Sequence, residues 1–161
     1  MRGANAEKMK SLAVVNTTLG GFSLDFVNLM KDDNGMASPL FDANRRDCTI
    51  NALFYNINEG KVEDWTGLGL SDLQAGVIRT PVDPMVTFGA CPLQAVRVFR
   101  FADRFDFELD ANIFLAARRP EIHALIDKVD PARKAVELEK ILLGSQPERT
   151  VAHMIAAGIW L

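Results

Sequence analysis

Cysteine and histidine are scarce in this sequence of 161 residues, which contains two of each. Cys48 and Cys91 lie far apart, so they form neither a close-spaced ligand pair nor a redox motif, and they predict reduced thiols in an intracellular protein. His123 and His153 are distant from each other and from both cysteines. Because catalytic zinc usually needs three protein ligands, no zinc site is expected.

Long apolar runs are also lacking. No run approaches the roughly 20 residues that a membrane-spanning helix requires, so no membrane span is predicted. Residues 1–15 (MRGANAEKMKSLAVV) carry Glu7 and have too short an apolar core for a secretory signal. We expect an intracellular protein, and the sequence does not distinguish cytoplasm, nucleus and mitochondrion.

An excess of positive charge is absent as well. The formal net charge is -3 and the isoelectric point is about 5.4, so the whole chain has no general attraction for nucleic acid. Any contact with RNA must depend on local basic patches. Hydrophobic residues make up 48% of the chain, which is enough to bury a core in one globular domain or two small lobes.

One local basic cluster lies within residues 45–56 (RRDCTINALFYN). Arg45 and Arg46 offer planar forks that match phosphate oxygens, while Asp47 and Asn51 can exchange hydrogen bonds with sugar hydroxyls. These residues immediately precede an apolar run. The cluster therefore predicts either a site for an anionic, hydroxyl-bearing ligand or the start of an amphipathic helix with solvated arginines.

The flanking segments predict short helices and antiparallel hairpins. We expect a helix over 4–12, strands over 13–19 and 22–29 joined at Gly20-Gly21, a loop or lid over 31–40, and a helix beginning over 41–49. A second hairpin is expected from 53–56 and 61–64, and a helix after residue 67 with Ser71 as its N-cap. Asp25 shares one strand face with Ser23, and faces either solvent or an active-site cleft.

The second half reads as helical throughout. Residues 92–105 place apolar side chains at a spacing of three, and on another face lie Gln94, Arg97, Arg100 and Arg104. This stripe is either a solvated surface or a surface for phosphates and carboxylates. Further helices are expected over 110–126, 132–143 and 147–159, with Glu137 exposed, Gly144 as a C-terminal cap and the last helix continuing to the chain end.

These motifs, in this order, resemble the class II tRNA nucleotidyltransferases that add CCA to tRNA 3′ ends, and the related bacterial poly(A) polymerases. Asn5–Lys8 and Phe22–Leu29 resemble the strand pair after the family's metal-binding motif, and Arg45–Ala52 resembles its sugar-recognition motif. Gly60–Gly67 together with Asp72-Leu73 resembles the hinge between head and neck, and Arg97–Phe105 resembles the first neck helix. The variants DFVNL and LFYN are similar to those of eukaryotic members.

The resemblance implies an α+β fold, with part of a polymerase-beta-like nucleotidyltransferase head over residues 1–83. An all-helical neck, which begins the RNA-binding region, would follow over 84–161. It also implies catalysis with Mg2+, with CTP, ATP and the tRNA 3′ end as partners. Asp25 would be a third acidic residue of the metal site. The nucleotide would contact Arg45, Arg46, Asp47, Asn51, Gln94 and Arg97. RNA phosphates would contact Arg100, Arg104 and Arg133.

The chain departs from the family at two motifs. The Asp-x-Asp pair that holds Mg2+ belongs before Asn5 and occurs nowhere in the chain, so no complete metal site is expected. Cys91 and Gln94 replace the Asp and Arg that read the base edges of CTP and ATP. Loss of both contacts predicts on the order of a hundredfold or more lower base selectivity.

We therefore expect part of a CCA-adding enzyme, incomplete at both ends, that is catalytically deficient as an isolated chain. One alternative is a noncatalytic nucleotide- or RNA-binding remnant. Another is an inactive truncated product with a bare sheet edge that folds poorly.

Overall fold

The computed structural model describes residues 14–31 and 34–161 of the chain. The helix expected over 4–12 and the motif residues Asn5–Lys8 lie outside the described residues. The chain divides into two compact units, Met1–Asp42 and Ala43–Leu161. Each unit is described separately below, and the domain boundary expected after residue 83 stays a prediction.

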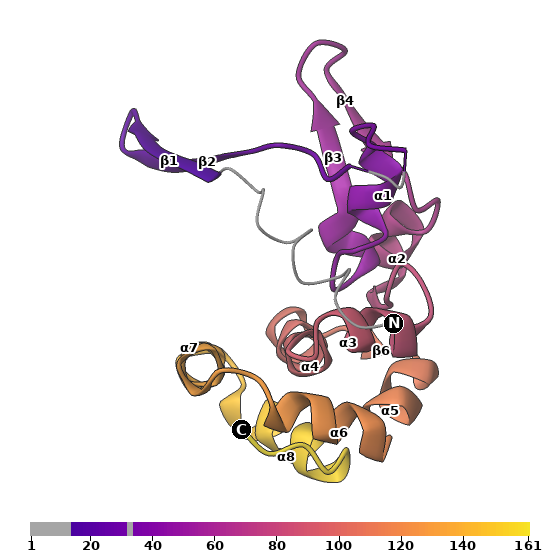
Figure 1. Ribbon diagram of the computed structural model, residues 1–161, viewed down its shortest axis with the longest axis vertical. Helices are drawn as coiled ribbons and strands as arrows, with labels where there is room; N and C mark the ends of the chain where they lie inside the picture. The colour runs from indigo at the N-terminus through magenta and orange to yellow at the C-terminus, as the bar shows by residue number, and fades with distance from the viewer. Residues whose placement is uncertain (1–13, 32–33) are drawn as a thin grey trace. The chain divides into compact units, whose positions relative to one another are not determined.

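The first unit contains a β-hairpin, as the sequence predicts. Strands β1 (Val14–Leu19) and β2 (Phe22–Val27) pair antiparallel, with Leu19 opposite Phe22 and Asn16 opposite Asp25. Gly20 and Gly21 both have positive φ angles, 58° and 85°, which only glycine adopts readily and which close the tight turn (Figure 1).

A short helix, α1 (Pro39–Ala43), begins inside the segment 31–40, so the loop expected there is wrong at Pro39 and Leu40. The Ser38 hydroxyl accepts a hydrogen bond from the Phe41 amide at 3.2 Å and so caps the helix start. The helix begins earlier than expected and ends at Ala43. The predicted helix over 41–49 is therefore wrong beyond Ala43, because the chain turns at Arg46, whose amide donates to the Ala43 carbonyl at 3.1 Å.

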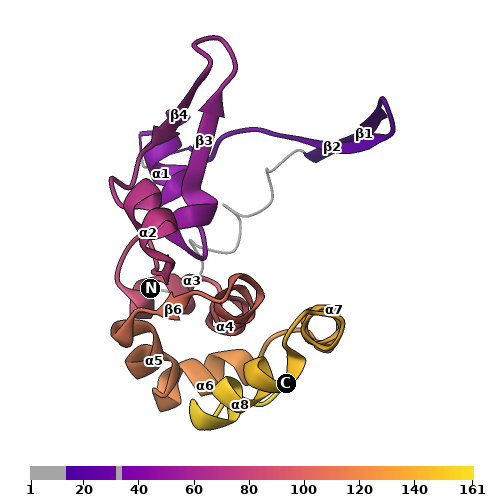
Figure 2. The same ribbon diagram turned by 180° about the vertical axis from the view of Figure 1, so that it is seen from behind.

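The second unit begins with a 3-10 helix and a second hairpin. Its elements are η2 (Thr49–Ala52), β3 (Leu53–Asn56), β4 (Lys61–Asp64), α2 (Gly69–Ala75) and β5 (Val77–Ile78). The predicted β3–β4 hairpin is confirmed, and it extends away from α2 in both views (Figures 1 and 2).

Helix α2 packs directly on η2 because it begins with a glycine. A Cβ atom at Gly69 would lie 2.8 Å from the Thr49 carbonyl oxygen, so no larger residue fits there. The predicted N-cap at Ser71 is wrong, since Ser71 lies inside the helix. Asp64 instead accepts hydrogen bonds from the Gly67 and Leu70 amides at 3.0 Å each.

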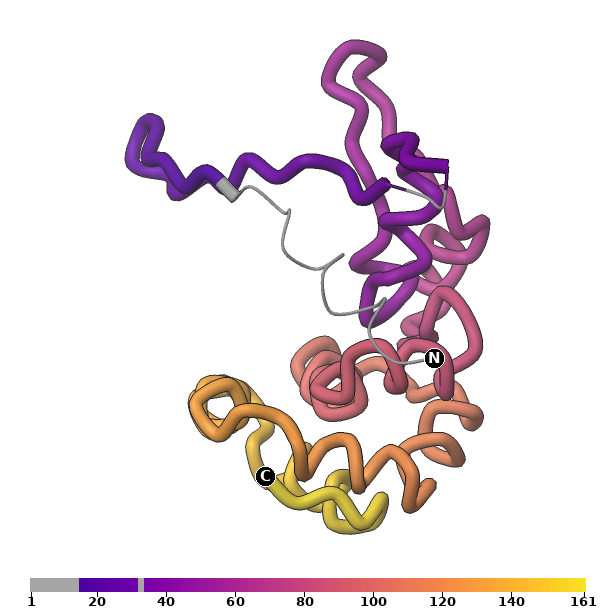
Figure 3. The backbone as a smooth tube through the Cα atoms, in the orientation of Figure 1, coloured from indigo at the N-terminus to yellow at the C-terminus, as the bar shows by residue number. Residues whose placement is uncertain are grey.

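The rest of the second unit is helical apart from one short strand. Its elements are α3 (Pro84–Ala90), α4 (Gln94–Phe105), β6 (Glu108–Leu109), α5 (Ala111–Ala117), α6 (Pro120–Asp127), α7 (Pro131–Leu142) and α8 (Pro147–Ala156). Strand β6 pairs parallel with β5, a contact that the sequence patterns miss. Figure 3 traces the path from α4 through α8.

Two of the expected helices have wrong bounds. The segment 110–126 forms two helices because Pro120 begins α6, and Arg119 before it takes an extended conformation with ψ 130°. The last helix ends at Ala156 rather than continuing to the chain end, and Gly158 follows it with a φ of 73°. Ile159 then folds back into the core and is 2% exposed.

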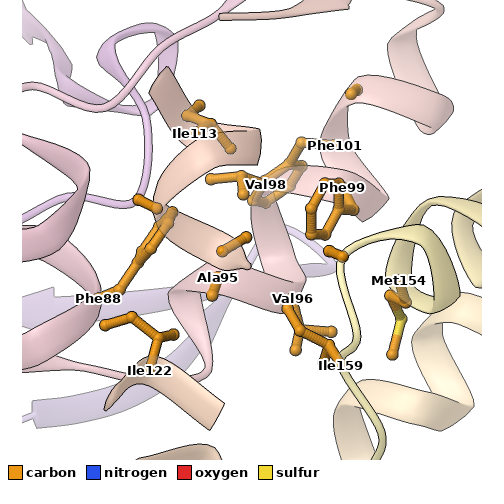
Figure 4. Packing of buried hydrophobic residues seen from close by; sticks show 14 of the residues in the cluster. Phe88, Ala95, Val96, Val98, Phe99, Phe101, Ile113, Ile122, Met154 and Ile159 are labelled. Atoms are coloured by element: carbon orange, nitrogen blue, oxygen red, sulfur yellow. The ribbon is translucent and has the colours of Figure 1, made fainter. Parts of the chain in front are cut away.

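Helix α4 lies at the centre of the hydrophobic core. Val96, Val98 and Phe99 are fully buried, and they pack with Phe88 of α3, Ile122 of α6 and Met154 of α8 (Figure 4). Phe99 meets Phe114 edge to face, with ring centroids 6.1 Å apart. Because other helices surround α4, some of its side chains pack in the core and others make polar contacts with neighbouring segments.

Candidate nucleotide-binding site

The predicted basic cluster forms a turn at Arg45–Cys48 that leads directly into η2, and this segment, called the Arg45–Asn51 loop below, is held mainly by Asp47. Asp47 is 4% exposed. Its Oδ1 accepts hydrogen bonds from the Cys48 amide and the Asn51 side-chain amide, both at 3.0 Å. Its Oδ2 lies 2.6 Å from Nη2 of Arg97 on α4. The carboxylate therefore fixes the loop to the core helix by a charge-assisted contact.

Cys48 is fully buried beside Asp47. Its thiol donates weakly to Asp47 Oδ1 across 3.6 Å. Burial, and then the neighbouring Asp47 carboxylate, raise the pKa of the Cys48 thiol well above its ordinary value. The group is therefore a neutral, unreactive thiol at neutral pH rather than a nucleophile.

A second set of polar contacts holds the loop through Thr49. The Thr49 hydroxyl donates to Asp72 Oδ2 at 2.7 Å, and the Thr49 amide donates to the Arg79 carbonyl at 2.8 Å. Arg79 in turn pairs with Asp72 at 3.2 Å and with Asp110 at 3.3 Å. Thr49 and Asp72 are buried, so these hydrogen bonds form away from water.

Gln94 also contacts the loop, through the backbone. Its side-chain amide donates to the Arg45 carbonyl at 3.0 Å. Gln94 and Arg97, both expected to face a nucleotide, thus contact Arg45 and Asp47 from the first turn of α4. The structure brings together Arg45, Arg46, Asp47, Asn51, Gln94 and Arg97.

The outer surface of this loop is cationic and polar. Arg45, Arg46 and Asn51 are exposed, whereas Asp47 is enclosed beneath them. The Arg46 guanidinium lies 6.0 Å from the centre of the Phe54 ring, a cation–π distance. Such a surface can bind phosphate oxygens through the guanidiniums and a hydroxyl through the Asn51 amide.

The other arginines do not share this surface. Arg100 donates from Nε to Glu137 Oε1 at 2.6 Å, and both side chains are largely buried, 11% and 6% exposed. The expectation that Glu137 is exposed is wrong: it lies four residues before the buried Ile141, on the same helix face. Arg104 and Arg133 are exposed on α4 and α7.

Asp25 belongs to the other compact unit. It is exposed on β2 and accepts a hydrogen bond from the Asn16 side chain across the hairpin. No group of three or more His, Cys, Asp or Glu residues that could hold a metal occurs among residues 14–31 and 34–161. Since Mg2+ takes oxygen ligands in fixed geometry, Asp25 and the enclosed Asp47 do not by themselves fit a Mg2+ site.

Two family models match this chain. Residues 7–79 match the Poly A polymerase head domain, and residues 106–160 match the probable RNA and SrmB-binding site of polymerase A. The chain belongs to the family of CCA-adding tRNA nucleotidyltransferases and poly(A) polymerases. The predicted family and fold class are thereby confirmed, with an α+β region followed by a mainly helical one.

Individual relatives agree with this assignment. The mitochondrial CCA tRNA nucleotidyltransferase of Saccharomyces cerevisiae is 44% identical over 153 residues, which cover 89% of this chain and 28% of the relative. The tRNA nucleotidyltransferase cca1 of Schizosaccharomyces pombe is 39% identical over 167 residues, which cover 98% of this chain and 33% of the relative. The chain thus spans about a third or less of the length of these relatives.

Solved structures show the same fold. A tRNA nucleotidyltransferase complexed with a primer tRNA and an incoming ATP analog superposes with a TM-score of 0.79 and 25% identity, covering 92% of this chain and 44% of that chain. A CCA-adding enzyme in complex with CTP gives a TM-score of 0.79 and 28% identity, and the match covers 94% of this chain and 36% of that chain. Within the described residues, every helix is too short or too polar to span a membrane.

Three contributors to the site escaped the sequence patterns: the ion pairs of Arg79 with Asp72 and Asp110, and the Arg97 pair with Asp47. The sequence indicates Asp72 only as a residue of the hinge motif. Its local signal is a carboxylate inside the short helix α2, which follows a Gly-rich turn. Arg79 and Asp110 carry no local signal, because their partners are distant in the sequence.

Proposed function

We propose that this chain contributes the nucleotide-holding part of a CCA-adding tRNA nucleotidyltransferase, which transfers CMP and AMP from CTP and ATP to tRNA 3′ ends. The single observation behind this is the Arg45–Asn51 loop, fixed to α4 by Asp47 and Arg97 at 2.6 Å with its cationic side outward. Arg45 and Arg46 hold the phosphates, Asn51 holds the sugar, and the enclosed Asp47 positions all of them.

Nucleotide binding tests this proposal directly. Titration of the 161-residue chain with ATP or CTP should show binding, and Arg46→Ala should weaken it by about tenfold or more, the value of a charged hydrogen bond. Arg118→Ala is the matched control, since Arg118 is also an exposed arginine resting on a phenylalanine ring, that of Phe114. Equal affinity of the parent chain and Arg46→Ala would refute the assignment.

The isolated chain should not catalyse the transfer. The support is in the sequence, which contains no Asp-x-Asp pair to hold Mg2+. Mg2+ is the family's cofactor, and at such a pair it would activate the 3′ hydroxyl of the tRNA and stabilise the leaving group. Purified chain should leave tRNA lacking CCA unextended in the presence of Mg2+, CTP and ATP. Robust addition of CCA would refute this deficiency while leaving the nucleotide-binding proposal intact.

A further inference from the structure

The β1–β2 hairpin has one apolar face and one polar face. Alternate residues of a strand point to the same side, and residues directly opposite each other on paired strands share a face. The apolar face therefore carries three cross-strand rows: Val15 with Phe26, Thr17 with Leu24, and Leu19 with Phe22. The opposite face carries Asn16, Thr18, Ser23 and Asp25, with Val27 at the end of β2. This pattern is typical of a sheet that packs through one face and leaves the other in water.

The large side chains of the apolar face are exposed. Val15, Leu19, Phe22 and Phe26 are 59%, 70%, 74% and 59% exposed. Among residues 14–31 and 34–161, no third strand pairs with β1 or β2. An isolated two-stranded hairpin is marginally stable in water, and packing of an apolar face against another layer adds to its stability. The hairpin therefore gains stability from any partner that covers this face.

The sizes of the side chains favour a second copy of the same hairpin as that partner. In every row the β1 side chain is smaller than the β2 side chain opposite it: Val against Phe, Thr against Leu, and Leu against Phe. A twofold axis along the hairpin places β1 of one copy over β2 of the other, so smaller side chains meet larger ones in each row. None of the six side chains is charged, so two identical faces approach without like-charge repulsion.

We propose that two copies of this chain associate through the apolar faces of their β1–β2 hairpins. A complete aromatic side chain buries roughly 150 to 250 Å², so the exposed parts of these side chains supply about 400 to 500 Å² per copy. A total of about 1,000 Å² lies at the lower end of specific interfaces, so the dimer should be reversible and concentration-dependent. The inference is independent of the proposed function, because no residue of this face belongs to the Arg45–Asn51 loop.

Sedimentation velocity tests the proposal with the 161-residue chain. Between about 1 μM and about 1 mM, monomer should convert to dimer. Thr17→Lys places an ammonium group in each apolar face, and should raise the dissociation constant of the dimer at least about tenfold. Thr18→Lys is the matched control, because it adds the same charge at the next residue of the same strand but on the polar face. It should leave the dissociation constant within about twofold of the parent value.

Three results would overturn the proposal. A chain that stays monomeric at every concentration would assign the apolar face to another segment or another protein. Equal effects of Thr17→Lys and Thr18→Lys would attribute association to net charge or to hairpin stability rather than to one face. An equal effect of Leu143→Lys, which changes an 80% exposed leucine of the second unit, would indicate nonspecific association of exposed apolar residues.

Salt and ATP provide two separate readouts. The proposed contact contains no ion pair, so raising the salt from about 0.05 M to about 0.5 M should not weaken the dimer, and weakening would contradict an apolar contact. ATP affinity depends on the Arg45–Asn51 loop, and should be equal in the parent and in Thr17→Lys. A dimer that binds no ATP would contradict the proposed function alone, and a monomer that binds ATP would contradict only the dimer.

Discussion

The Arg45–Asn51 loop and the β1–β2 hairpin hold their carboxylates in opposite ways. Asp47 in the loop is 4% exposed and pairs with Arg97, fifty residues further along the chain. Asp25 in the hairpin is exposed, and its partner Asn16 lies directly across the turn. One acid is fixed by tertiary structure and the other by local pairing.

The residues around Asp47 and around Asp25 also differ in burial. Cys48 and Thr49, which follow Asp47, are fully buried, whereas Phe22 and Val15 of the hairpin are 74% and 59% exposed. An isolated two-stranded hairpin is marginally stable, while a polar contact beside a packed core is protected from water. Substitutions in the second unit should therefore change the free energy of unfolding far more than those in the hairpin.

The largest effect is expected at the buried pair of Arg100 and Glu137. Glu137→Ala leaves a buried guanidinium without its carboxylate, and should lower the free energy of unfolding by about 3 to 5 kcal/mol. Urea denaturation followed by circular dichroism measures the change. Glu139→Ala is the control, because Glu139 is exposed on the same helix, and it should stay within about 0.5 kcal/mol.

The double substitution Arg100→Met with Glu137→Leu gives a second measurement that does not depend on how much of the Glu137→Ala protein folds. Replacing both charges by apolar groups removes the unpaired ion, and should recover much of the loss. If the single and double variants were equally unstable, the pair would not act as a unit, and the contrast between buried and exposed acids would lose its main support.

A smaller effect is expected where the loop meets Asp72. Thr49→Val removes the 2.7 Å hydrogen bond to Asp72 with little change of shape, and should lower the free energy of unfolding by about 1 to 2 kcal/mol. ATP affinity should fall as well, because the loop is less firmly held. Thr18→Val on the exposed face of β1 is the matched control, and a loss there as large as at Thr49 would remove the distinction between the two regions.

The sequence predicts the local elements better than the contacts between them. Both hairpins follow from alternation and turn glycines, and the apolar face of α4 follows from its helical period. Glu137 was misplaced because charge favours a solvent position, although its phase with Ile141 indicates burial. The sequence also does not predict the break between α5 and α6 at Pro120, because the apolar pattern of residues 110–126 continues across this proline.

The candidate site shows the same limit. Arg45, Arg46 and Asn51 are recognisable from residue chemistry and spacing, because they lie within one short segment. Their support by Arg97 and Asp72 depends on pairs separated by tens of residues, which no local pattern encodes. The pairing of β5 with β6 is likewise nonlocal, since two-residue strands give no detectable alternation.

Cys48 adds a pH dependence that the hairpin lacks. Because burial raises the pKa of this thiol in the folded state, the unfolded chain loses its proton first as the pH rises above about 9. The free energy of unfolding should then fall by up to about 1.4 kcal/mol per pH unit. Urea titrations at several alkaline pH values measure this slope, which Cys48→Ala should reduce.

The smallest effect is expected at Asp25. Asp25→Ala removes one exposed cross-strand hydrogen bond with Asn16, and should change the free energy of unfolding by no more than about 0.5 kcal/mol. The same urea experiment measures it, with Asn16→Ala as the partner control, because both substitutions delete the same bond and should agree. A loss above about 1 kcal/mol, or two clearly different values, would mean that Asp25 has stabilising contacts beyond its strand neighbour. In that event the carboxylate would be held as Asp47 is, and the distinction between a locally paired acid and one fixed by tertiary structure would fail at the residue that defines it.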